Sequence, residues 1–296
     1  MRGCGDAGRQ RTAGDAQAQD RAGDPGRGPG RLSVVGLGPG DPGLLCPLAR
    51  AALASASAVV GYSGYLDLLE PEVLEGREVV STGMTGEVER AGRAVDLALA
   101  GRDVAVVSSG DAGIYAMAGL VLEVLEERGL LERVPCEVVP GVPALAAAAA
   151  LLGAPLTHDF ACVSLSDLLT PWEVIERRLD AAAGADFVIV LYNPRSKRRA
   201  DHLERALAVI ARHRGLDTPV GVVSRAYRPG QRVEVARLAD VDCGGVDMQT
   251  IVVVGASSSR AVAERMLTPR GYAGKYNLLG GTRKVRQRLA NTRSKA

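Results

Sequence analysis

The stretch that decides the fold is LSVVGLGPGDPG, residues Leu32 to Gly43. It begins as a short apolar run, which is typical of a buried strand, and then breaks into a turn rich in glycine and proline. Glycine-rich turns of this kind, placed between a strand and a helix, hold the phosphates of dinucleotides in many α/β proteins. The first question is therefore whether this turn binds a nucleotide phosphate or another ligand.

The turn departs from a dinucleotide fingerprint in three ways. Gly36 and Gly38 fit the pattern, but its third glycine is replaced by Asp41, whose carboxylate repels a pyrophosphate. Pro39 removes an amide donor that a phosphate cradle needs. The acid expected after the second strand is missing, since Gly-Tyr stands at 61–62. The sequence favours a rigid backbone close to a ligand, with Asp41 as a helix N-cap, and a plain tight turn is the alternative.

The rest of the chain alternates between short β-branched runs and helical patterns. From residue 32 to about 155 this alternation predicts a largely parallel sheet covered on both faces. After residue 160 the runs are shorter and closer together, which predicts antiparallel strands mixed with helices near 172–183, 202–214 and 259–267. We therefore expect an α/β fold of two domains in tandem, with a ligand cleft between them.

Composition divides the chain further. We expect a disordered extension over 1–31, an N-terminal α/β domain over 32–157, a C-terminal α/β domain over 158–270 and a basic flexible tail over 271–296. The chain has a formal net charge of +2, while residues 1–32 carry +2 and residues 271–296 carry +7. The part between them is therefore acidic, at −7.

The composition also argues against several classes of protein. The five cysteines are scattered without a Cys-x-x-Cys pair and the chain has three histidines, so no metal site is predicted and a reducing cytoplasm is expected. No uncharged apolar run approaches the length of a membrane span, and the N-terminus lacks the apolar segment of a secretory signal. Aromatic residues make up 3%, which argues against stacking on nucleic acid.

Two further turns follow strand-like runs in the first half. SSGDAGIY, Ser108 to Tyr115, places Gly110 and Asp111 after one run, and PGVPA at 140–144 follows the next. Because the carboxyl ends of parallel strands share one edge of a sheet, we expect these turns and Pro39 to line one pocket. Capping of the next helix is the alternative role for Asp111.

The order of the motifs VVGLGPGDPGLL, SSGDAGIY, VPGVPALAAAAALLGAPLTHD, VLYNPRS, VVSRAY and TIVVVGAS resembles that of the tetrapyrrole methylases. The resemblance covers about residues 32–270, which is most of the chain. Within this family, HDFACVSLSDLLTPWEVIERRL and LYNPRSKRR are similar to the branch that methylates precorrin-3B at ring carbon 17 in cobalamin biosynthesis.

The resemblance implies a site for S-adenosyl-L-methionine between two α/β domains, in a homodimer. The uroporphyrinogen methylases of the family have an aspartate after the second strand that is proposed as a base. Ser63 stands there in this chain, so that role cannot be transferred. Pro143 stands where the family commonly has a small hydroxyl residue, and Pro39 would line the substrate side. The residues at the positions of the family's cofactor site are Pro39, Gly110, Asp111, Ile114, Pro143, Ala144, Tyr192, Asn193, Ala226, Thr250 and Ile251.

Methyl transfer from a sulfonium to a ring carbon is a direct displacement, so the protein mainly aligns the reactants and excludes water. The carboxylates of a tetrapyrrole call for cations, which two clusters supply. Ring contraction calls for a proton acceptor, for which the candidates are Asp111, Ser166 and Asp167. The alternatives are His158, Asp159, Ser164 and Thr170, with a hinge role as the other reading of His158. The cationic candidates are Arg195, Lys197, Arg198 and Arg225, with Arg228 close to the last of them.

Other functions are compatible with parts of the sequence. A nicotinamide-dependent oxidoreductase is disfavoured by Asp41 and Pro39. The same fold could methylate another precorrin, a ribosomal RNA or a protein histidine, and the basic segment 271–296 would suit RNA. A non-catalytic binding module fits poorly with three converging turns. The motifs favour a corrin precursor, with or without cobalt, and no nucleic acid or membrane partner.

Overall fold

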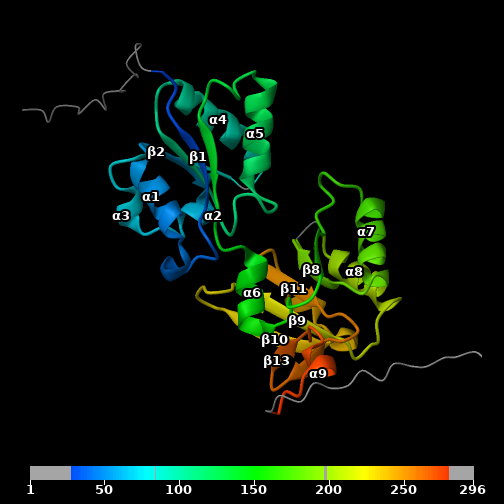
Figure 1. Ribbon diagram of the computed structural model, residues 1–296. Coiled ribbons are helices and arrows are strands. Elements are labelled where there is room, and N and C mark those ends of the chain that lie inside the picture. The colour runs from blue at the N-terminus through cyan, green and yellow to red at the C-terminus, as the bar shows by residue number, and fades with distance from the viewer. Residues whose placement is uncertain (1–27, 84, 197–198, 280–296) are drawn as a thin grey trace, which may run out of the picture.

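We analysed a computed structural model that describes residues 28–279 except 84, 197 and 198. Figure 1 shows two lobes, one built from the first part of the chain and one from the second. Each lobe contains a five-stranded sheet, and a small three-stranded sheet adjoins the second. The predicted α/β fold, with a parallel first half and a mixed second half, is confirmed.

The first sheet is entirely parallel, with the strand order β3-β2-β4-β1-β5. Its register pairs Gly36, the last residue of β1, with Ser108, the last residue of β4, so both strands end at the same level. The strands are β1 Leu32–Gly36, β2 Ala58–Tyr62, β3 Glu78–Thr82, β4 Val104–Ser108 and β5 Cys136–Val139. The helices of this lobe are α1 Pro47–Ser55, α2 Ser63–Leu66, α3 Pro71–Leu74, α4 Glu87–Leu99 and α5 Met117–Glu127.

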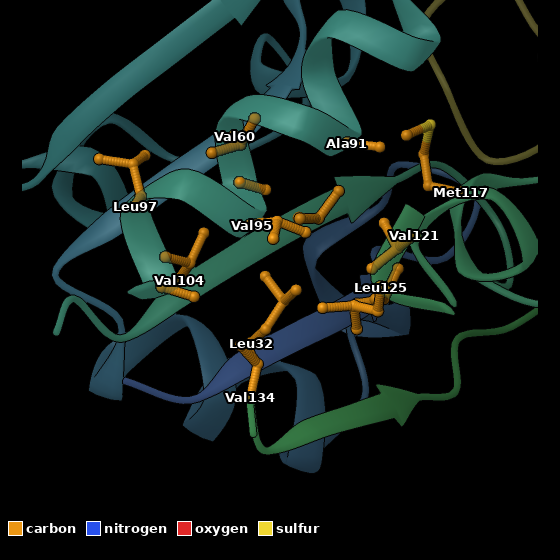
Figure 2. Close-up of a cluster of buried hydrophobic side chains, with 14 of the residues drawn as sticks. Leu32, Val60, Ala91, Val95, Leu97, Val104, Met117, Val121, Leu125 and Val134 are labelled. Carbon is orange, nitrogen blue, oxygen red and sulfur yellow. The ribbon is translucent and has the colours of Figure 1, made fainter. Parts of the chain in front are cut away.

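Side chains that alternate along the strands build a core on each face of this sheet. Leu32 and Val34 of β1 pack with α4 and α5, for example against Val95 and Leu125 (Figure 2). The next residue, Val35, packs on the opposite face with α1. Because both faces are covered, the strands are continuous apolar runs, as the sequence indicates.

The second sheet has the order β10-β9-β11-β8-β7, in which only β7 and β8 are parallel neighbours. Helices α7 Trp172–Gly184 and α8 His202–Ala211 cover one face. Helix α6 Ala144–Leu152 packs on the other face, where Leu152 lies against Gly221. The strands are β7 Phe160–Ser164, β8 Val188–Tyr192, β9 Pro219–Ser224, β10 Arg232–Arg237 and β11 Thr250–Val254.

The prediction of a helix near 259–267 is wrong, because this segment forms a hairpin. Strands β12 Arg260–Val262 and β13 Arg265–Leu267 are joined through Ala263 and Glu264, both at positive φ. Strand β13 also pairs with β6 Gly153–Ala154 and buries Met266 completely. Backbone pairing to β6 and this burial outweigh the helical propensity of the segment.

The expected boundary between residues 157 and 158 stays a prediction. Helix α6 precedes that boundary in the chain but packs on the second sheet, and the connection from β5 to α6 crosses between the lobes in Figure 1. Most of the extension 1–31 and of the tail 271–296 lies outside the described residues, although α9 Tyr272–Lys275 falls within the latter range. Within the described ranges, no helix has the length and apolar character of a membrane span.

Candidate functional site

The loops that follow β1 and β4 are joined by their backbones. Gly38 and Gly110 exchange two hydrogen bonds, with N···O distances of 3.0 and 2.7 Å. Both glycines have positive φ, at 72° and 69°, a conformation that glycine adopts without strain. The pair sets the geometry of the sheet edge at which the sequence places the ligand.

The loop after β5 packs directly against the other two. A Cβ atom on Gly141 would lie 2.2 Å from the carbonyl oxygen of Gly110 and 2.6 Å from that of Gly36. Both contacts are with backbone, which cannot move aside as a flexible side chain can. Glycine at 141 is therefore required for the three loops to meet.

Asp111 holds two of these loops together. Its Oδ1 accepts a hydrogen bond from Gly113 N at 2.8 Å, and its Oδ2 accepts one from Gly141 N at 3.1 Å. Because both oxygens are engaged by backbone amides, the carboxylate acts here as a structural link between β4 and β5. Its predicted catalytic and cofactor-binding roles stay predictions.

Tyr192, at the end of β8, lies against the start of α6 and against Tyr115 of the first lobe. Its hydroxyl accepts a hydrogen bond from Leu145 N at 3.0 Å, which fixes the start of α6 next to Pro143 and Ala144. Burial raises the pKa of Tyr192 to about 12, so the phenol stays protonated at neutral pH. The ring of Tyr115 lies 5.1 Å from the ring of Tyr192. Four of the predicted cofactor residues thus lie near one another: Ile114, Pro143, Ala144 and Tyr192.

Tyr115 is a contact residue that the sequence reasoning missed. It has a φ of 52° in the loop after β4, and its hydroxyl donates to the carbonyl oxygen of Cys162 on β7 at 3.1 Å. Burial raises its pKa as well. A side chain of the first lobe therefore bonds directly to the second sheet.

Asn193 follows Tyr192 with a φ of 52° and begins a chain of polar contacts. Its Nδ2 donates to Ser164 Oγ at 2.9 Å, and the same oxygen accepts from Ser166 N at 3.2 Å. The Oγ of Ser166 in turn accepts from Arg199 at 3.3 Å. These contacts link the predicted cofactor residue Asn193 with the predicted catalytic residue Ser166.

Asp167, the third catalytic candidate, contacts a buried histidine. His202 Nε2 lies 3.0 Å from Asp167 Oδ2, and its Nδ1 lies 3.3 Å from Asp201 Oδ1. The ring of Trp172 packs against the imidazole of His202, with the two ring centroids 4.9 Å apart. Desolvation acts to raise the pKa of Asp167, but hydrogen bonding to His202 and its charge outweigh desolvation, and the pKa is lowered. The carboxylate is therefore held ionised at the end of β7.

Three predicted residues lie at the second sheet: Ala226 follows β9, and Thr250 and Ile251 begin β11. Thr250 is buried, and its hydroxyl is occupied by Ser224 at 2.8 Å and Asp247 at 2.9 Å. Ile251 and Ala226 belong to the apolar cluster shared with α6. Any polar contact from Thr250 to a cofactor would therefore come from its backbone.

The predicted substrate arginines differ in how they are paired. Arg195 donates to Glu204 at 2.9 Å and to the carbonyl oxygen of Cys243 at 3.0 Å, so its charge is balanced within the second lobe. Arg225 donates to Gln249 at 2.8 Å and lies 3.9 Å from Asp247. Lys197 and Arg198 lie outside the described residues.

The site includes features that suit an adenosyl sulfonium ligand. The backbones of several glycines pack closely together at the site, and apolar side chains from both lobes lie next to them. Ser108 Oγ, at the end of β4, is buried and has no hydrogen-bond partner among residues 28–279 as described. Within the same part of the chain, no group of histidine, cysteine and carboxylate side chains could hold a metal ion. The site thus lies where the strand ends of one lobe of an α/β protein meet the other lobe, which is the usual place for a small-molecule ligand in this class of fold.

This chain belongs to the family of Tetrapyrrole (Corrin/Porphyrin) Methylases, whose model matches residues 31–242. The family uses S-adenosylmethionine. The family assignment made from the motifs is confirmed.

Three curated relatives with more specific names are similar to this chain. "Cobalt-factor III methyltransferase" of Priestia megaterium is 47% identical over 84% of this chain, which spans 46% of that longer protein. "Probable cobalt-factor III C(17)-methyltransferase" of Salmonella typhimurium is 48% identical over 81% of this chain and 99% of its own length. "Precorrin-3B C(17)-methyltransferase" of Sinorhizobium sp is 42% identical over 83% of this chain and 98% of its own length.

Two solved structures share the fold. The methyltransferase CobJ superposes with a TM-score of 0.78 at 39% identity, over 81% of this chain and 100% of the other. A uroporphyrin-III C-methyl transferase from Thermus thermophilus, in complex with S-adenyl homocysteine, superposes with a TM-score of 0.57 at 28% identity, over 76% and 97%.

Proposed function

We propose that this chain transfers a methyl group from S-adenosylmethionine to ring carbon 17 of cobalt-factor III, or of precorrin-3B, with ring contraction, in cobalamin biosynthesis. The observation that carries the proposal is the joining of three strand-end loops by Gly38, Gly110 and Gly141, with Tyr115 connecting them to Cys162 and Tyr192 of the second lobe. A ligand at this junction would contact both lobes. The names of the relatives support the choice of substrate.

When bound, the cofactor supplies an electrophilic methyl group, and the protein aligns the reactants and excludes water. We assign the cofactor to Gly110, Asp111 and Ile114 on the first lobe and to Tyr192, Asn193 and Ala226 on the second. Asp111 keeps the two loops of the first lobe at a fixed separation. The other assigned residues are Pro39, Pro143, Ala144, Thr250 and Ile251.

We assign the proton acceptor of ring contraction to Asp167 rather than to Asp111. Both oxygens of Asp111 accept hydrogen bonds from amides, whereas Asp167 keeps an exposed carboxylate whose Oδ2 contacts His202. Ser166, next to it, receives a hydrogen bond from Arg199, so its hydroxyl can still donate to a ligand oxygen. A homodimer is a further prediction that follows from the family resemblance.

Two measurements test the function. Calorimetric titration should show binding of S-adenosylhomocysteine and none of NAD. Incubation with cobalt-factor III and S-adenosylmethionine should then yield a singly methylated tetrapyrrole and an equal amount of S-adenosylhomocysteine. Binding of S-adenosylhomocysteine without conversion of cobalt-factor III or precorrin-3B would overturn the substrate, and binding of NAD alone would overturn the whole proposal.

A further inference from the structure

Arg228 connects the two lobes next to the candidate site. It lies in the loop between β9 and β10, and its Nε donates a hydrogen bond to the carbonyl oxygen of Pro39 in the turn after β1. Its side chain also covers Gly40, where a Cβ atom would lie 2.7 Å from Arg228 Nε. The first turn and the hairpin of the second lobe are therefore held together by this arginine.

Arg228 differs from the other arginines near the site in its charge pairing. Arg195 pairs with Glu204 and Arg225 lies near Asp247, but Arg228 forms no ion pair with a carboxylate in the described part of the chain. Its side chain is partly buried, and desolvation lowers its pKa, with the Tyr65 phenol acting in the opposite direction. A cation that is removed from water without a counterion is costly, so an anionic ligand at this position would be stabilising.

An open hollow of about 490 Å³ is lined in part by Arg228, and its volume lies in the range of small-molecule sites. Arg228 is the one cation in its lining, and Asp41, the one carboxylate, has its Oδ1 engaged by Gly43 N at 2.7 Å. The lining comes from both lobes: Gly40, Asp41, Pro42, Tyr227, Arg228, Pro229 and Gln231.

We infer that Arg228 binds a carboxylate of the tetrapyrrole substrate in this hollow, and that it thereby determines specificity for acidic macrocycles. The inference rests on the proposed function, since it takes the substrate to be a polycarboxylate. A carboxylate in the hollow would supply the missing counterion and use the planar donor fork of arginine. Because Nε is occupied by Pro39, the terminal nitrogens would bind the ligand.

The test compares Arg228→Gln and Arg228→Lys with Arg232→Gln as the matched control. Arg232 is exposed on the adjacent strand β10 and donates to one carbonyl oxygen, that of Gly245 at 3.0 Å. Binding of cobalt-factor III is followed by absorbance, and binding of S-adenosylhomocysteine by calorimetry. We expect Arg228→Gln to weaken cobalt-factor III binding about 10-fold or more, because a hydrogen-bonded charge is lost. Arg228→Lys should recover part of the affinity, since it keeps the charge without the fork.

Affinity for S-adenosylhomocysteine should fall less than affinity for cobalt-factor III in both Arg228 variants, because losing the hydrogen bond to Pro39 affects both ligands while losing the cation affects the substrate alone. Arg232→Gln should match the wild type throughout. Equal binding of cobalt-factor III by the wild type and Arg228→Gln would overturn the inference. A parallel loss of both affinities together with a lower melting temperature would also overturn it, by showing that Arg228 serves only to join the lobes. If the wild type binds neither cobalt-factor III nor precorrin-3B, the proposed function fails first and the inference fails with it.

Discussion

At the scale of single residues, Asp111 is the side chain on which the loop geometry depends most directly. Asp111→Ala removes the acceptor for Gly113 N and Gly141 N. Because hydrogen bonds to a charged group contribute about 1.5–3 kcal/mol each, we expect a loss of about 2 kcal/mol or more in the free energy of unfolding. We also expect weaker binding of the cofactor. Denaturant unfolding measures the loss of stability, and calorimetry with S-adenosylhomocysteine measures the affinity. Unchanged cofactor affinity in this variant would contradict the assigned role.

Tyr192 allows a prediction about alkaline pH. Its pKa rises from 10.0 to about 12 in the folded protein, so the folded state holds this proton more tightly than the unfolded state. The resulting stability is complete below pH 10 and is lost as the pH rises from 10 to about 12. Tyr192→Phe should therefore lose less stability than the wild type over this interval, as measured by denaturant unfolding at each pH. Parallel curves for the two proteins would count against the burial argument.

His202 acts on the chemistry through Asp167. The variant His202→Gln removes the contact that lowers the pKa of Asp167, so that pKa should rise. If Asp167 accepts the proton, the acid limb of the kcat profile moves to higher pH, because an ionised carboxylate is then lost sooner on acidification. His213→Gln is the matched control, since His213 pairs with Asp180 on the neighbouring helix at 2.8 Å. The same acid limb in both variants would remove Asp167 from the mechanism.

At the scale of elements, the meeting of the three loops depends on Gly141. Gly141→Ala would place a methyl group within 2.2 Å of the Gly110 carbonyl oxygen, so we expect destabilisation of about 3 kcal/mol or more and loss of cofactor binding. Gly119→Ala is the control, because Gly119 lies on α5 with nothing within 4 Å of the added atom. That variant should be neutral or more stable by about 0.5–1 kcal/mol. Equal melting temperatures for the two variants would refute the packing argument.

The elements that the sequence predicted well are those with strong local signals. Strands β1 and β4 are apolar runs that end in glycine turns, and Asp41 caps a turn of 3-10 helix at Pro42–Leu44 as expected. The prediction of a helix near 259–267 is wrong because the conformation of this segment depends on pairing with β6, more than 100 residues earlier in the chain. Local propensity carries no information about such a partner.

At the scale of the whole molecule, the motifs indicated the family and a site at strand ends, but not how the lobes contact each other. Tyr115 and His202 contribute contacts that the motifs did not predict, whereas Ser164, one of the hydroxyl candidates, contacts Asn193. Their partners are brought together only by the tertiary fold. Arg195 shows the reverse case, since its position in a basic cluster favoured substrate binding while the fold pairs it with Glu204.

The measurement that tests the account most directly is the position of the transferred methyl group. Cobalt-factor III is incubated with the full chain and S-adenosylmethionine carrying an isotopically labelled methyl, and the product is examined by nuclear magnetic resonance. We predict one labelled methyl group, attached to ring carbon 17 of a contracted macrocycle. A label on another ring carbon, or no label in the tetrapyrrole while the cofactor binds, would contradict the central claim.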